Sequence, residues 1–163
     1  MDWVLAILLF LHVFGAIVAF GPTYAFILLG PMIGREPQHA NFAIRYQHLV
    51  STRMIAPLAV FQGITGALIV WRVGINVLAT PWLLIAIVLY LIALAIAFMV
   101  LLPTAAKLVE ATSTPPPPPA PGATPPAGPP PQMVALVRRA RMAGMVNAGL
   151  VVVIVFLMVT RPA

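Results

Sequence analysis

Residues 80–103 read TPWLLIAIVLYLIALAIAFMVLLP, an uninterrupted apolar stretch without a charged side chain. A helix that crosses the hydrocarbon core of a bilayer needs about 20 such residues. Because lipid offers no water to backbone amides and carbonyls, these groups must bond within their own helix. The stretch therefore predicts a transmembrane helix and places the chain among the all-α polytopic membrane proteins.

Three further uncharged stretches are bounded by the few charged residues, which number 9 Lys and Arg and 3 Asp and Glu. Each stretch is long enough for one crossing and too short for two crossings with a turn. We predict four spans at about residues 3–29, 50–71, 80–103 and 138–160. The whole chain, residues 1–163, is expected to form a single membrane domain, a four-helix bundle.

The composition excludes several classes of protein. Of 163 residues, 62% are apolar and 7% are charged, whereas soluble domains contain about 25% charged residues. The net charge of +6 reflects the scarcity of acids and is not gathered on one face, so no nucleic-acid partner is expected. The absence of cysteine excludes disulfides, thiolate zinc sites and iron–sulfur clusters.

The distribution of basic residues predicts the orientation in the membrane. Seven of the nine lie between spans one and two or between spans three and four: Arg35, Arg45, Arg53, Lys107, Arg138, Arg139 and Arg141. The positive-inside rule places these connections in the cytoplasm and both termini on the other side. Trp3, Trp71 and Trp82 lie at the opposite ends of their spans, as an interfacial aromatic belt requires.

The connection at residues 112–132 reads TSTPPPPPAPGATPPAGPPPQ and contains most of the chain's 18 prolines. This composition favours polyproline II and predicts a flexible cytoplasmic loop between spans three and four. A docking segment for a proline-recognising partner is the alternative.

A second connection, residues 37–53, carries polar residues at helical spacing and leads into span two. One interpretation is a solvated face with arginines near lipid phosphates. The other is a site for an anion or a cofactor carboxylate, formed by Arg45, His48 and Arg53. Pro22 in span one and Pro57 in span two are each expected to bend their helix by removing an internal hydrogen bond.

Small residues four apart mark the faces where helices are expected to approach one another. The pairs and the triplet are Gly15 and Ala19, Gly63 and Ala67, Ala93 and Ala97, and Ala140, Gly144 and Ala148. This spacing predicts a compact bundle that associates with other membrane subunits or with itself.

The predicted spans contain no Asp or Glu, which argues against a proton pump or an ion-coupled carrier. His12, Gln62 and Tyr90 each lie eight or nine residues from a belt tryptophan, so all three are about 12–14 Å deep. Asn147 is deeper. The three side chains at one level either hydrogen-bond between helices or form a ligand site. In the second case His12 is a possible axial ligand for the iron of haem b.

The first span, FLHVFGAIVAFGPTYAFILL (residues 10–29), together with REPQHANFAIRYQ (35–47) and FQGITGALIV (61–70), resembles a family of predicted four-helix bacterial membrane proteins of unknown function. The resemblance implies an inner-membrane location. A more distant similarity links the first span to copper-resistance D proteins and to bacterial membrane protoporphyrinogen oxidase. In the oxidase, a histidine of the first helix and a lysine of the third helix are the functional pair. His12 matches the histidine, whereas Tyr90 occupies the mid-span level of the third span, which contains no lysine.

The sequence favours a non-catalytic accessory or scaffold subunit of a larger membrane assembly, embedded in the lipid bilayer. One alternative is a redox or porphyrin-handling protein that binds haem b through His12. A further alternative is a small transporter or channel.

Overall fold

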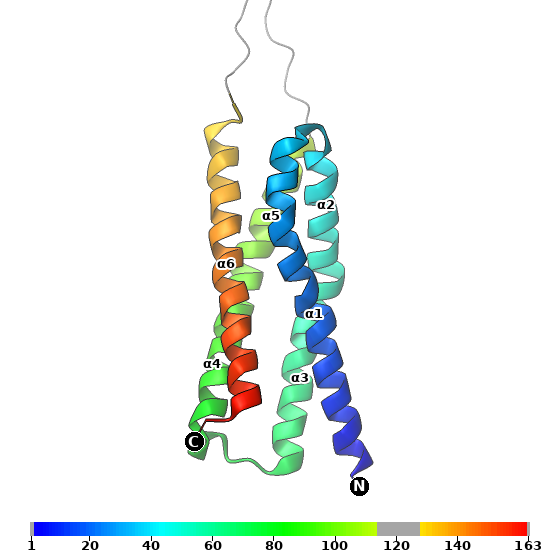
Figure 1. Ribbon diagram of the computed structural model, residues 1–163, viewed down its shortest axis with the longest axis vertical. Coiled ribbons are helices and arrows are strands. Elements are labelled where there is room, and N and C mark those ends of the chain that lie inside the picture. Colours follow the sequence, from blue (N-terminus) through cyan, green and yellow to red (C-terminus); the bar gives the residue numbers. More distant parts are fainter. Residues whose placement is uncertain (1, 114–127, 163) are drawn as a thin grey trace, which may run out of the picture.

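The computed structural model describes residues 2–113 and 128–162, and within these residues the chain is almost entirely helical and has no strand (Figure 1). Four helices are long and apolar enough to cross a membrane: Trp3–Arg35, Pro37–Val73, Pro81–Ser113 and Pro131–Thr160. The predicted fold class is confirmed. Each helix is longer than the about 20 residues that a crossing needs, because backbone hydrogen bonding does not stop at the edge of the hydrocarbon.

Helix α1 (Trp3–Arg35) forms the first crossing and continues through Pro22 and Pro31. Asp2 caps its first turn, since the Leu5 amide donates to the Asp2 carboxylate at 3.2 Å. The helix ends before Pro37, whose ring disfavours helical geometry in the preceding residue.

The second crossing is one helical rod made of four segments in sequence. A short 3-10 turn, η1 (Pro37–His39), precedes α2 (Ala40–Val50), then a π-helical turn, η2 (Ser51–Ile55), and α3 (Ala56–Val73). Gly74 ends the rod with φ of 72°, a left-handed conformation that glycine adopts without a steric penalty.

The third crossing repeats this construction in the opposite direction. After a short turn, η3 (Val77–Ala79), come α4 (Pro81–Ile96), a second π-helical turn, η4 (Ala97–Leu101), and α5 (Leu102–Ser113). The fourth crossing is the single helix α6 (Pro131–Thr160).

Both π-helical turns have the same cause. Pro57 and Pro103 each lie two residues beyond a π-helical turn. Proline has no amide hydrogen, and its ring collides with the carbonyl four residues earlier, which belongs to Arg53 or Met99 in the middle of each turn. Widening the helix by one π turn relieves that collision. The disturbance expected at Pro57 is therefore a local π turn, and Pro103 produces a second one.

The helices lie side by side, with both chain ends at one end of the bundle (Figure 1). We call this the terminal end, and the opposite end, where α5 stops and α6 starts, the loop end. Helix α1 packs chiefly on α3, α4 on α6, and α2 on α5. The buried apolar positions are mostly alanines, among them Ala19, Ala59, Ala86, Ala93 and Ala148, so the helices approach closely.

Polar contacts join helices at both ends of the bundle. At the terminal end, Arg72 and Asp2 form an ion pair of 2.8 Å. At the loop end, the Asn41 amide donates to the Thr112 hydroxyl at 3.0 Å. Of the predicted loop 112–132, the first two residues belong to α5 and the last two to α6, while 114–127 lie outside the described residues.

Candidate functional site

His12 joins α1 to α3 within the apolar part of the bundle. Its Nδ1 lies 2.9 Å from the hydroxyl oxygen of Thr65. That hydroxyl also lies 3.0 Å from the carbonyl of Phe61 and 3.1 Å from the carbonyl of Gln62. Carbonyls only accept, so we infer that Thr65 donates to its own helix and receives the Nδ1 hydrogen of His12. Nε2 of His12 is then left with a free lone pair.

Gln62 forms the second contact between the same two helices. Its side chain is 6% exposed, and its Nε2 donates to the backbone carbonyl of His12 at 2.7 Å. Its Oε1 is buried without a hydrogen-bond partner among the described residues. A Cβ atom at Gly15 would lie 2.8 Å from this oxygen. The close approach of α1 to α3 therefore depends on glycine at position 15.

Tyr90 joins α4 to α3 on a neighbouring face of α3. Its hydroxyl donates to the carbonyl of Ala59 at 2.7 Å. A Cβ atom at Gly63 would lie 2.6 Å from the same hydroxyl oxygen. As at Gly15, a glycine lets a polar side chain of one helix reach the backbone of the next.

The structure thus brings His12 and Gln62 together and attaches Tyr90 separately to the same helix. No hydrogen bond in the described part of the chain joins Tyr90 to His12 or to Gln62. Asn147 belongs to neither contact: its Oδ1 is buried and has no partner in the described residues. Next to it, the Ala148 carbonyl accepts a hydrogen bond of 3.3 Å from Tyr24, which links α1 to α6.

Thr65 is the residue of this site that the sequence analysis did not assign to a role. Gln62 and Thr65 are three residues apart, a spacing that puts both on one side of a helix. That spacing was the available signal. The pairing of Thr65 with His12 depends on how α1 and α3 are rotated, which the spacing does not show.

The second predicted site, Arg45, His48 and Arg53, lies on α2 and η2 towards the loop end. Both arginines are exposed, and His48 is half-buried, with its Nδ1 lacking a partner among the described residues. No hydrogen bond between these three side chains occurs in the residues that the structure describes. The anion site stays a prediction.

The four apolar crossings and the hydrogen bonds between them define a polytopic α-helical membrane protein. The chain belongs to the family described as "Predicted integral membrane protein (DUF2269)", whose model matches residues 6–162. This confirms the resemblance to a membrane family without an assigned function. Comparisons with curated proteins and with solved structures gave no match. The more distant similarity of the first span to copper-resistance D proteins stays a prediction.

Proposed function

We propose that the protein is a non-catalytic accessory or scaffold subunit of a larger membrane assembly. One observation carries this proposal: three polar side chains inside the crossings bond to neighbouring helices of the same chain. His12 bonds to Thr65, Gln62 to the His12 carbonyl, and Tyr90 to the Ala59 carbonyl. Such bonds fix the register of membrane helices and contribute about 0.6–2 kcal/mol each.

The outer surface supports association with other membrane helices. Gly15 and Gly63 are covered by neighbouring helices of the chain, whereas a Cβ atom at Gly144 or Gly149 would meet no atom within 4 Å. Gly149 is exposed on α6. An exposed glycine in a membrane helix lets a second helix approach its backbone closely.

The scaffold proposal predicts that the protein migrates as part of a larger complex when membranes are solubilised in a mild detergent. Gly149→Leu is expected to shift the protein to the mass of the single chain, because the new side chain blocks close helix approach. Native gel electrophoresis with an antibody against a tag measures this. Val152→Leu, which lengthens an exposed side chain on the same helix, is the matched control. A wild-type protein that migrates as a single chain contradicts the proposal.

We further propose that the loop end faces the cytoplasm of a bacterium and that the terminal end faces the other side of the inner membrane. The support is the excess of basic residues at the loop end. Because the chain has no cysteine, single substitutions such as Ser113→Cys and Pro162→Cys report sidedness directly. An impermeant thiol reagent added to intact cells should label only the Pro162→Cys variant. Labelling of only the Ser113→Cys variant would show that the chain has the opposite orientation.

A second candidate function is binding of haem b through His12. The observation that favours it is the contact of Nδ1 with the Thr65 hydroxyl, which in the tautomer inferred above leaves the Nε2 lone pair free to bind iron. Ligand histidines are commonly oriented in this way by a partner on the other ring nitrogen. The other histidines, His39 and His48, are on η1 and α2 near the loop end, so this chain offers one axial ligand at that level. A second axial ligand would come from a partner subunit.

The haem candidate predicts a Soret band in the visible spectrum of protein purified from membranes that contain haem. His12→Ala is expected to abolish the band, because it removes the iron ligand. His39→Ala, in an exposed turn, is the matched control and should leave the band intact. A protein without a Soret band after expression with added haem, or a band that survives His12→Ala, contradicts the candidate.

A further inference from the structure

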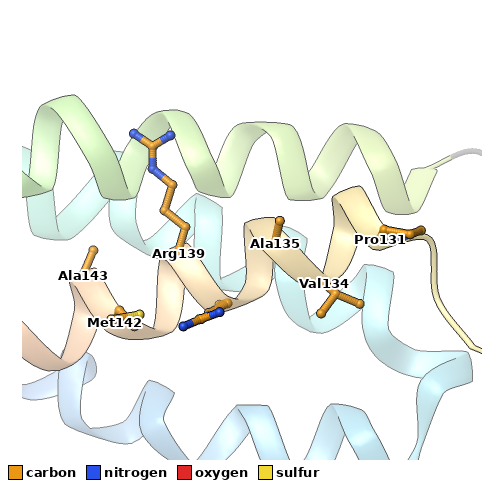
Figure 2. Close-up of a pocket in the computed structure, with 7 residues that line it drawn as sticks. Pro131, Val134, Ala135, Arg139, Met142 and Ala143 are labelled. Atoms are coloured by element: carbon orange, nitrogen blue, oxygen red, sulfur yellow. The ribbon is translucent and has the colours of Figure 1, made fainter.

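The first turns of α6 carry an open, shallow surface depression lined by residues of α6. Val134, Ala135 and Met142 give it an apolar lining, and Arg138 and Arg139 border it. Figure 2 shows Arg139 extending towards α5, while Val134 and Met142 lie on the other side of α6. Arg138 and Arg139 therefore leave α6 on different sides, and Arg138 is the one in line with Met142, four residues further along.

The two arginines have no counter-charge of their own. The ion pairs in the described residues join Arg72 to Asp2 and His39 to Glu36. Arg138 and Arg139 are both exposed and lie within ion-pair distance of no described carboxylate. An arginine pair without an internal partner attracts an external anion, and guanidinium groups match the geometry of phosphate oxygens.

The position of the arginines along α6 identifies the available anion. Arg139 lies 21 residues before Thr160, a distance of about 32 Å along a helix. The hydrocarbon core of a bilayer is about 30 Å thick. If α6 begins to cross at Thr160, Arg138 and Arg139 reach the level of the phosphates in the opposite leaflet. The nearest phosphates are then those of lipid headgroups.

An apolar stripe continues from the arginines towards the middle of the membrane. Met142 and Val146 follow Arg138 at intervals of four residues, and they are 57% and 55% exposed. Side chains four apart lie on the same side of a helix. A lipid whose phosphate lies at Arg138 would therefore extend an acyl chain along Met142 and Val146.

We propose that this face of α6 binds an anionic phospholipid from the leaflet at the loop end. Arg138 binds its phosphate, Arg139 adds a positive charge on the neighbouring side of the helix, and Met142 and Val146 contact an acyl chain. The net charge of the lipid provides the selectivity, because a zwitterionic headgroup presents its own cation beside the phosphate. The proposal is independent of the scaffold and haem functions and holds whichever side of the membrane the loop end faces.

Native mass spectrometry of the purified full chain, titrated with phosphatidylglycerol or with phosphatidylcholine of the same acyl chains, tests the proposal. The wild type should bind phosphatidylglycerol more tightly than phosphatidylcholine. The double variant Arg138→Gln/Arg139→Gln should weaken phosphatidylglycerol binding about 30-fold, from the loss of two positive charges near the headgroup. Met142→Gln should weaken binding of both lipids, because it affects the acyl chain and not the charge.

The matched control is Arg35→Gln/Arg45→Gln, which removes the same charge from exposed positions of α1 and α2 towards the loop end. It should change the affinity less than about threefold, since these two arginines belong to other helices and not to the stripe of Arg138, Met142 and Val146. Inorganic phosphate at millimolar concentration should not displace the lipid, because it makes no acyl contact. Equal loss in both double variants, no preference for the anionic lipid, or displacement by inorganic phosphate would each overturn the proposal. Circular dichroism checks that every variant is folded.

Discussion

Gly15→Leu is expected to force α1 away from α3 and to lower the free energy of unfolding by about 3 kcal/mol. A Cβ atom at this position would lie 2.8 Å from Oε1 of Gln62 and 3.5 Å from the ring of Phe61. Gln62 is buried and held by its bond to the His12 carbonyl, so moving it out of the way costs that bond. The substitution therefore breaks the Gln62 contact and the neighbouring His12–Thr65 contact together.

Reversible denaturation by sodium dodecyl sulfate in mixed micelles, followed by circular dichroism, measures this effect. Gly21→Leu is the matched control on the same helix, because a Cβ atom there would meet nothing within 4 Å. It should change the free energy of unfolding by less than about 0.5 kcal/mol. A spin label on one cysteine in α1 and one in α3 should also report a longer distance between these helices in Gly15→Leu, and an unchanged distance in Gly21→Leu. Equal destabilisation by the two leucines would contradict the packing of α1 on α3 described above.

Gly63→Ala is expected to lower the free energy of unfolding by about 1–2 kcal/mol through its clash with Tyr90. The added methyl group would lie 2.6 Å from the tyrosine hydroxyl oxygen, so Tyr90 must move and lose its bond to the Ala59 carbonyl. Tyr90→Phe alone removes this bond and should cost about 0.6 kcal/mol, the average for such bonds in membrane proteins. In the Tyr90→Phe background, Gly63→Ala should cost about 1 kcal/mol less, because the closest clashing atom is gone.

A double-mutant cycle of these two substitutions isolates the coupling from the intrinsic gain of replacing glycine by alanine in a helix. Gly144→Ala on α6 measures that gain by itself, since its added methyl group would have no neighbour within 4 Å. We expect Gly144→Ala to be neutral or stabilising. Strictly additive effects of Gly63→Ala and Tyr90→Phe would show that the tyrosine does not lie over Gly63.

Parts of the site were predictable because they depend on distances along single helices. The spacing from the belt tryptophans placed His12, Gln62 and Tyr90 at one depth. In the structure, His12 of α1 and Gln62 of α3 form hydrogen bonds that join these two helices. Tyr90 of α4 also bonds to α3. Gly15 and Gly63 were recognisable as positions of close helix approach from their small-residue spacing. The side chains that pack against these glycines, Gln62 on Gly15 and Tyr90 on Gly63, could not be predicted, because each belongs to a different helix from its glycine.

Other features escaped prediction for the same reason. Asp2 and Arg72 each end a span, and only the packing of α1 on α3 brings them within 2.8 Å. Pro57 was expected to bend its helix, and the structure has a π turn before it. The helix forms this turn to relieve the collision with the proline ring while neighbouring helices hold it in place. The matching π turn before Pro103 has no signal beyond the proline itself.

Hydropathy along the chain is enough to predict that this protein is helical and has four apolar crossings, because each crossing satisfies its backbone internally. The meeting of particular polar side chains is a property of the packed bundle. Successive residues point about 100° apart around a helix, so a contact between helices depends on the rotation of each about its axis. That rotation turns Thr65 towards His12 and Gly63 towards Tyr90, and it is fixed by the packing of all four crossings together.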